Sequence, residues 1–581
     1  MIKERLNIRK IMLLSVPVGI AAGIFTVLFL KALDFSTHVF LEQLVGYIPP
    51  KPSGEGGRLP YLYSPENIYL LPFVTALGGL ITGLLIYFLS PESAGIGTDA
   101  AIRAFHKGLP LGFKTAILKL VTSAITIGSG GASGREGPMA LIGASVGKGI
   151  AKLFKLSPKE QNILLAAGLG AGIGAVFRAP FAGGILSAEV FYKEDFEVEA
   201  LIPGFLASII AYIVAGSFIG FQTLFNISLH KLTFSQEIIA GYVILGIVSA
   251  VVAKLLINIF YKVEDYFKNI KVPDYIKPAI GGFVVGICGI ITPLAIGNGY
   301  GWIQMLMNDN MSFFSPFKLF ISIFLVILAL SFTLGSGGSG GVFGPSLVIG
   351  GITGAWLSTF FNSILGAKVF QISSMTMVGM ISVFTAAASA PLSTIVLVAE
   401  MTRGYDLLPL AIISIVVAYV LAGNEKTIFK SQVKSRLQSP VHQDELKVHL
   451  LEIAKVKDVM TKNVITISPE EPAIKAREIM AEKFIAGLPV VVNGVVVGIV
   501  TTSDILKLNP EELEHVKVRE IMTPQPNCVL PDWTLLETLQ LFISRGYGRA
   551  PVVKDFESMK LVGIISRSDI SRYMIKRSIV E

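Results

Sequence analysis

The sequence predicts a polytopic α-helical membrane protein with internally repeated halves and broken re-entrant helices, followed by a cytoplasmic α/β pair. Three observations lead to this prediction. The 581 residues have a mean hydropathy of +0.66 and only 15% of them are charged, yet charged residues become frequent after Lys426. A glycine-rich motif occurs twice in the hydrophobic part, and a strand and helix pattern occurs twice in the polar tail.

The hydrophobic part contains ten apolar runs of uneven length. A hydrocarbon core of about 30 Å takes about 20 helical residues, so some of these runs are too short to cross it. Helices that stop inside a bilayer persist only where protein or water lines their exposed backbone. The runs are Met12–Phe35, Tyr69–Leu89, Ala116–Ile127, Asn162–Val176, Leu201–Ile219, Ile238–Phe260, Pro278–Ile296, Phe317–Leu334, Phe370–Ala386 and Leu407–Ala422.

Four basic residues precede the first apolar run: Lys3, Arg5, Arg9 and Lys10. The run is long, lacks a small-residue cleavage site and is followed by more spans, so we interpret it as a retained span. Basic flanks favour the cytoplasm, which places the amino terminus inside, the loop Gly46–Glu66 outside and the connection Asp99–Lys114 inside. This topology accounts for the net charge of +8, so we expect a lipid bilayer and no nucleic acid as a partner.

The composition gives no sign of an enzyme. Cys288 lies in an apolar run and Cys528 in the polar tail, so the two cysteines build neither a disulfide framework nor a thiolate metal site. No Ser-His-Asp, metal-ligand or phosphoryl-transfer arrangement is visible in the sequence. We therefore expect no catalytic residue, no metal and no required cofactor.

The repeated motif reads GSGGASGREGPMALIG at Gly128–Gly143 and GSGGSGGVFGPSLVIG at Gly335–Gly350. In both copies a glycine-rich turn runs through Gly-Pro into an apolar run of helical composition, and Pro is tolerated just inside a helix start. A helix N-terminus carries unpaired N–H donors and about half a positive charge, so two of them at one depth would bind an anion. Close helix packing through glycines is the alternative, but packing alone would not require the carboxylate of Glu136.

The repetition extends beyond this motif, because FRAPFAGGILSAEV at Phe177–Val190 resembles ASAPLSTIVLVAEM at Ala388–Met401. The membrane part is therefore predicted to consist of two related halves, about 12–192 and 201–421. Repeated halves place a substrate site near the bilayer midplane, where the halves meet.

Each half carries one glutamate in this second motif, Glu189 and Glu400. Such carboxylates either pair with backbone donors at helix ends or take part in transport chemistry. We favour the pairing with backbone donors.

The polar tail contains two segments that repeat one another, Val456–Leu506 and Val516–Tyr573. Each begins with a (V/I)MT motif, which reads KDVMT in the first segment and REIMT in the second. Each then continues through an amphipathic helix and closes with a β-branched strand. Short strands that alternate with helices predict a small α/β module present twice.

Each module carries a hydroxyl and a carboxylate at a strand-to-helix step, Thr501 with Asp504 and Ser566 with Asp569. An Asp at such a step could hold a ribose while the hydroxyl and the helix start hold a phosphate, which would make a nucleotide site. The same residues are good N-caps, and capping alone accounts for them equally well.

These motifs resemble those of the CLC family of chloride channels and proton-coupled chloride transporters. GREGP at Gly134–Pro138 is similar to the family's G(K/R)EGP motif. The resemblance implies that Glu136 is the gating glutamate, whose side chain occupies the external anion position until protonation or an anion displaces it. GVFGP at Gly341–Pro345 fits GxFxP, which implies that Phe343 lends a backbone amide to the pathway. The tail resembles a tandem pair of cystathionine-β-synthase (CBS) domains, which in several family members bind adenine nucleotides.

Three positions depart from the family pattern. Ile96, in GIGTD, stands where a serine hydroxyl meets the central anion, and Phe429 replaces the facing tyrosine of the last membrane helix. A hydrogen bond to a charged acceptor contributes about 1.5 to 3 kcal/mol, so the loss of both hydroxyls should weaken the central site. Val190 stands where exchangers carry a proton-relaying glutamate. The anion contacts that the resemblance implies are Gly95, Ile96, Gly97, Arg135, Glu136, Gly137, Val342, Phe343 and Phe429.

The resemblance implies a homodimer with one pathway per subunit, with chloride or another small anion as substrate and an adenine nucleotide at the CBS pair. The expected domains are a transmembrane domain over 1–430, a linker over 431–451, and CBS domains over 452–510 and 511–581. Passive conduction, proton-coupled exchange and a sensing scaffold with little transport are left as alternatives. A fluoride preference is a further one, because some fluoride exporters of the family also lack the serine.

Overall fold

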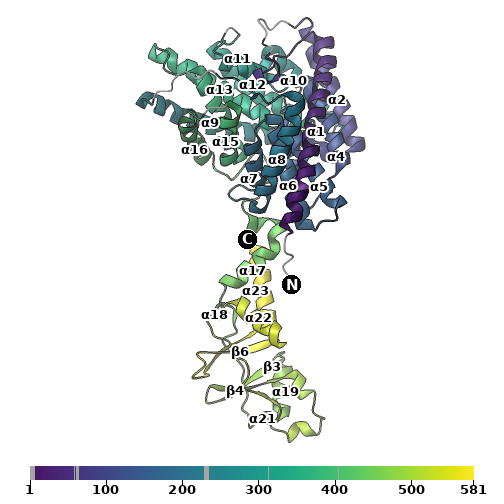
Figure 1. The fold of residues 1–581 in the computed structure, drawn as a ribbon. Coiled ribbons are helices and arrows are strands. Elements are labelled where there is room, and N and C mark those ends of the chain that lie inside the picture. The colour runs from purple at the N-terminus through teal and green to yellow at the C-terminus, as the bar shows by residue number, and fades with distance from the viewer. Residues whose placement is uncertain are drawn as a thin grey trace. The chain divides into compact units, whose positions relative to one another are not determined.

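A computed structural model describes residues 7–57, 59, 65–227, 234–311, 313–402 and 405–580 (Figure 1). The chain divides into two compact units, Met1–Val441 and His442–Glu581. Lys3 and Arg5, on which the predicted orientation partly rests, lie outside the described residues, as does part of the loop Gly46–Glu66.

Each of the ten apolar runs forms a helix. Seven helices among the described residues are long and apolar enough to cross a membrane, and four apolar helices are shorter, at 10–17 residues. The helices of the ten runs are α1 (Ile8–Thr37), α2 (Leu71–Leu89), α4 (Phe113–Gly128), α6 (Pro158–Phe177), α8 (Val198–Ile219), α9 (Gln236–Asn269), α10 (Lys277–Ile291), α12 (Pro316–Gly335), α14 (Ile372–Ala388) and α16 (Leu408–Ala422).

Six further helices follow glycine- or proline-containing turns. Two of them begin inside the repeated motif, with Pro138 and Pro345 each at the third helical position, as the sequence predicts. Most residues of these two helices are buried, 16 of 18 in α5 and 15 of 23 in α13, so the two helices lie in the interior of the membrane unit. The six are α3 (Gly97–Lys107), α5 (Glu136–Leu153), α7 (Pro180–Glu189), α11 (Tyr300–Met307), α13 (Phe343–Leu365) and α15 (Pro391–Thr402).

Glycines allow the central helices to touch along their backbones. A Cβ on Gly143 of α5 would lie 2.0 Å from the carbonyl oxygen of Gly168 on α6, which lies beside it (Figure 1). A Cβ on Gly350 of α13 would lie 2.2 Å from the carbonyl oxygen of Gly379 on α14. The close packing that the sequence offered as an alternative therefore occurs behind the motif loops, in both copies.

The tail unit is an α/β structure with two small antiparallel sheets. One sheet has the order β3-β4-β5 and the other consists of β6 and β7. Its elements are α17 (Gln443–Ile453), α18 (Val456–Val459), α19 (Ala473–Glu482), β3 (Gly487–Val492), β4 (Val495–Thr501), α20 (Thr502–Ile505), α21 (Val518–Ile521), β5 (Thr523–Pro524), α22 (Leu535–Arg545), β6 (Arg549–Val553), β7 (Leu561–Ser566) and α23 (Arg567–Val580).

The opening motif of each repeat in the tail pairs with the closing strand of the other repeat. Thr461, which ends KDVMT, forms a bridge with Ile564 of β7. Thr523, which ends REIMT, pairs with Ile499 of β4. The two modules therefore exchange their first segments, and each hydrophobic core draws on both repeats.

Candidate anion pathway

The three loops that the sequence indicates meet inside the membrane unit. β1 (Gly95–Ile96) pairs in parallel with β2 (Ser339–Gly340), and Gly134 forms a bridge with Gly341. The loops touch through glycine, because a Cβ on Gly137 would lie 2.4 Å from the Cα of Gly341. A larger side chain at this contact would force the loops apart.

Each loop leads into the N-terminus of a helix, namely α3, α5 or α13. Their N-cap residues are Ile96, Arg135 and Val342, and none of these three makes a side-chain capping bond. The first backbone N–H groups of the helices are therefore not capped by a side chain. Together with the positive ends of three helix dipoles, they form an environment that suits an anion.

The carboxylate of Glu136 lies fully buried at this meeting point. Its Oε1 accepts a hydrogen bond of 2.6 Å from the hydroxyl of Tyr300, and the Nε of Arg135 lies 3.7 Å away. Its Oε2 has no hydrogen-bond partner among the described residues. A Cβ built on Gly134 would lie 2.4 Å from Oε2, and one on Gly344 would lie 3.0 Å from it, so the carboxylate fills the space between the two motif copies.

Tyr300, at the start of α11, is a contact that the sequence analysis missed. Its ring packs against Phe225 with centroids 5.6 Å apart, and the guanidinium of Arg135 lies 5.4 Å from its centroid. The residue is fully buried, so its hydroxyl is held on the carboxylate of Glu136. A tyrosine directly after the turn GNG, at a helix start, is the only local signal for this position.

Lys119 of α4 is a second missed residue, and it places a buried amine beside the first loop. Its Nζ donates to the carbonyl oxygens of Ser93, at 2.9 Å, and Gly95, at 3.0 Å. Thr122 and Ser123, on the same helix, hydrogen bond to the hydroxyl of Ser339 in β2 at 2.9 and 2.8 Å. One face of α4 therefore fixes both strands of the loop pair through hydrogen bonds.

The aromatic residues expected at the pathway lie in packed surroundings. The ring of Phe343 lies between Phe384 and Phe177, with centroids 3.6 and 4.8 Å away, so its side chain packs on neighbouring rings. Phe429 is buried but lies in a non-helical segment after α16, so the expectation of a helix there is wrong. The segment is tied to the start of α3 instead: Ser431 donates from its backbone N–H and hydroxyl to Asp99, at 2.7 and 2.9 Å.

Glu189 and Glu400 pair with backbone donors, as we favoured from the sequence. The carboxylate of Glu189, at the end of α7, accepts from the N–H groups of Leu392 and Ser393 at the start of α15, both at 2.8 Å. The carboxylate of Glu400, in α15, accepts from two N–H groups at the start of α7, at 3.0 and 2.7 Å. The two helices thus cap each other, and Val190 directly after α7 is buried and carries no proton-binding group.

The four predicted nucleotide contacts form two capping boxes. The carboxylate of Asp504 accepts from the hydroxyl of Thr501 at 2.7 Å and from its N–H at 3.0 Å. Asp569 accepts in the same way from Ser566, at 2.6 and 3.0 Å. These bonds are those of the capping alternative.

Arg549, which the sequence analysis missed, lies between the two capping boxes. Thr501 pairs across its sheet with Gly487, and Ser566 pairs across the other sheet with Arg549. A Cβ on Gly487 would lie 3.0 to 3.1 Å from the side chain of Arg549, so the two sheet edges meet there. The structure therefore brings both boxes to one basic side chain.

Comparison with known proteins identifies the family. The model of the voltage gated chloride channel family matches residues 78–423, and the CBS domain model matches residues 456–511 and 518–576. The chain belongs to the CLC family. It is therefore an integral, multi-pass membrane protein of anion transport with C-terminal tandem CBS domains, and not an enzyme.

Relatives within the CLC family include both channels and exchangers. The voltage-gated ClC-type chloride channel ClcB of Salmonella typhimurium is 27% identical over 416 residues, which cover 71% of this chain and 95% of the relative. The H(+)/Cl(-) exchange transporter ClcA of Yersinia pseudotuberculosis is 28% identical over 435 residues, which cover 73% and 87%. The fold is shared with a slow cyanobacterial Cl-/H+ antiporter, at a TM-score of 0.62 and 24% identity, over 72% of this chain and 96% of the antiporter.

Proposed function

We propose that this CLC protein carries chloride or another small anion through a glutamate-gated pathway lined by helix N-termini, with one pathway in each subunit of a homodimer. The observation that carries the proposal is the buried carboxylate of Glu136 at the meeting point of three helix starts. A carboxylate is itself an anion, so it competes with the transported ion for the same backbone donors. Its displacement therefore opens the pathway.

The remaining expected contacts support a site formed mainly by backbone. Gly95 lies in β1, and Gly97 and Gly137 lie in the first turns of α3 and α5, while Ile96 and Val342 offer only apolar side chains. The anion is held by N–H groups and by the charges behind the loops rather than by hydroxyls. Central binding is accordingly weak, and Phe429 contributes no donor from its side chain.

Replacing Glu136 tests the gate. Glu136→Gln and Glu136→Ala are expected to raise chloride efflux from liposomes or to remove its pH dependence, because the competing charge is gone. Glu189→Gln is a matched control, since it removes a buried carboxylate whose hydrogen bonds cap α15. Unchanged flux and unchanged pH response in both Glu136 variants would rule out the role.

We further propose that the membrane unit consists of two internally repeated halves within a domain over 1–430. The mutual capping of α7 and α15 and the matched glycine contacts of α5 with α6 and α13 with α14 support this arrangement. A linker over 431–451 then leads to CBS domains over 452–510 and 511–581. The basic residues before α1 favour a cytoplasmic amino terminus, with the CBS domains on the same side.

Val190 favours a channel or a weakly coupled exchanger, because valine cannot relay a proton. Reversal potentials of the reconstituted protein distinguish the alternatives. A pH gradient at equal chloride is expected to leave the potential near zero. A shift toward the proton gradient would instead establish exchange, and the absence of any anion current or flux would favour a sensing scaffold.

We also propose that an adenine nucleotide binds the CBS pair through Thr501, Asp504, Ser566 and Asp569. Arg549 supports this assignment, because it pairs with Ser566 and its side chain lies beside Gly487, so a guanidinium that can bind a phosphate is close to the predicted contacts. Calorimetry of the full chain with ATP should show binding that Asp504→Ala, Asp569→Ala and Arg549→Met each weaken. Heat changes equal to buffer would favour capping as the only role of these residues.

A further inference from the structure

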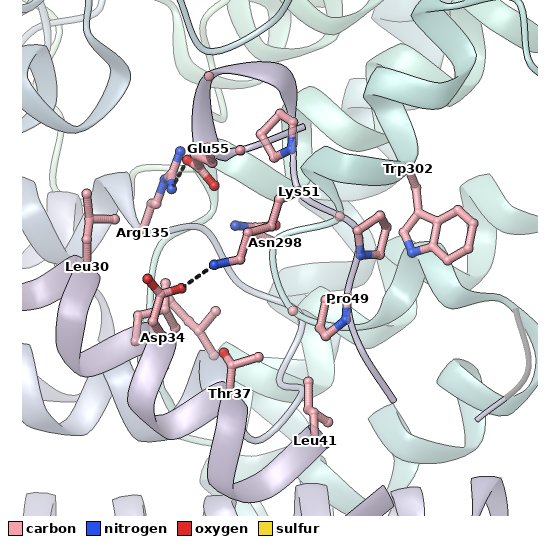
Figure 2. Close-up of a pocket in the computed structure, with 18 of the residues that line it drawn as sticks. Leu30, Asp34, Thr37, Leu41, Pro49, Lys51, Glu55, Arg135, Asn298 and Trp302 are labelled. Atoms are coloured by element: carbon pink, nitrogen blue, oxygen red, sulfur yellow. Dashed lines mark hydrogen bonds and ion pairs between the residues drawn. The ribbon is translucent and has the colours of Figure 1, made fainter. Parts of the chain in front are cut away.

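A cavity of about 690 Å³ lies directly in front of Arg135 (Figure 2). Residues of α1, of the segment Pro49–Gly56 and of the turn before α11 line it. Figure 2 shows two ion pairs across this space: Lys51 to Asp34, at 2.7 Å, and Arg135 to Glu55. The cavity thus leads from the segment Pro49–Gly56 to the residue that precedes the gate.

The pair between Glu55 and Arg135 joins a buried cation to a partly exposed carboxylate. The side chain of Arg135 is 2% exposed and that of Glu55 is 21% exposed. The contact uses Nη1 of Arg135, while its Nη2 and Nε have no hydrogen-bond partner among the described residues. Arg135 lines the cavity and its guanidinium keeps donors without a hydrogen-bond partner in the described part of the chain, so it is suited to hold an anion, and Glu55 occupies its Nη1.

The backbone that presents Glu55 is fixed by the surrounding structure. The N–H of Gly54 donates to the carbonyl of Leu224 at 3.1 Å, and the N–H of Ser53 donates to the side chain of Gln304 in α11 at 3.3 Å. A Cβ on Gly54 would lie 2.3 Å from the carbonyl oxygen of Thr223, so the segment sits directly on its neighbour. Glu55 can therefore leave Arg135 by rotation of its side chain, without movement of the loop.

We propose that Glu55 is an intramolecular competitor that holds Arg135 until an incoming anion replaces it. The assignment rests on the proposed anion pathway and adds an outer carboxylate in front of Glu136. While the pair is closed, an anion arriving from the cavity lacks one of its donors and meets a negative charge. Glu55 thus sets the anion concentration at which transport from this side begins, whereas Glu136 sets whether the pathway is open.

Chloride uptake by liposomes that contain the full chain tests this assignment, with chloride varied on the side that carries the segment Pro49–Gly56. The apparent affinity of the protein for chloride falls in proportion to the fraction of molecules in which Arg135 is free of Glu55. If the Glu55–Arg135 pair is closed in about nine-tenths of the molecules, the half-saturating chloride concentration rises about tenfold. Glu55→Gln is expected to lower that concentration by about this factor. Glu42→Gln is the matched control, because Glu42 lines the same cavity but pairs with His38, at 2.8 Å.

The outcomes separate this inference from the proposed gate. Equal half-saturation in Glu55→Gln, Glu42→Gln and the wild type would overturn the competitor role, and it would leave the gate standing if Glu136→Gln still alters flux. If Glu136→Gln is also without effect, both assignments fail. Chloride binding to detergent-solubilised Glu55→Gln provides a second measurement should flux be lost, and an affinity no tighter than that of the wild type would overturn the inference.

Discussion

Tyr300→Phe removes one oxygen from the site while it keeps the ring that packs on Phe225 and Arg135. The lost hydrogen bond is the 2.6 Å contact with Oε1 of Glu136, and the nearest ion-pair partner of this oxygen, Nε of Arg135, is 3.7 Å away and too far to replace it. A hydrogen bond to a charged group contributes about 1.5 to 3 kcal/mol. At about 1.4 kcal/mol per factor of ten, the blocking position of the ionised carboxylate should lose roughly tenfold to hundredfold in population relative to its displaced position.

Stopped-flow chloride efflux from liposomes measures this change, and we expect Tyr300→Phe to increase the rate wherever release of Glu136 limits transport. Tyr47→Phe is the control, since it removes another buried hydroxyl, which accepts from Trp302 at 3.0 Å and has no contact with Glu136 among the hydrogen bonds of the described residues. In a Glu136→Ala background the effect of Tyr300→Phe should vanish, because no carboxylate is left to hold. An unchanged rate in the single variant, or an equal increase in both backgrounds, would refute the reasoning.

Three further variants have expected outcomes. Lys119→Met leaves two buried carbonyl groups without their donor, at a cost of about 1 to 3 kcal/mol each. The unfolding temperature and the chloride affinity should therefore both fall, and a variant in which neither changes would contradict the role of Lys119. Ile96→Ser restores a hydroxyl at the start of α3 and should tighten chloride binding about tenfold by calorimetry, and equal affinities would count against a backbone-only central site. Asp504→Ala or Asp569→Ala removes a capping box and should lower the stability of the tail by about 1 kcal/mol in thermal unfolding, whereas full stability would show that the caps are not used.

The helices and the meeting of the loops could be predicted because their signals are local and repeated. Apolar length alone marks a membrane helix, and a Gly-Pro turn before an apolar run marks its start. The two copies of the motif indicated that two helix starts face one region, which matches the bridge between Gly134 and Gly341.

The polar contacts of the site could not be predicted, because they join residues that are far apart in the chain. Tyr300 and Glu136 are 164 positions apart, and nothing near either residue signals the other. Lys119 occurs in an apolar run, where burial of its amine is unfavourable without hydrogen-bond partners. The sequence does not reveal the two carbonyl groups that accept its hydrogen bonds. The prediction of a helix at Phe429 is wrong for a related reason, since the contact of Ser431 with Asp99 of α3 joins residues that are far apart in the chain.

The mutual capping of α7 and α15 has a consequence for how the chain is made. Glu400 is synthesised 219 positions after Phe181, whose N–H it accepts. Ribosomes add about 5 to 20 residues per second, so the start of α7 waits for its partner for about 10 to 45 s after it emerges. During that interval its amide groups need water or the insertion machinery as a substitute. The amino-terminal half of the protein therefore cannot reach its native state until the carboxy-terminal half has entered the membrane, and ribosome-bound chains that end before Glu400 should still be recognised as unfinished by membrane quality control.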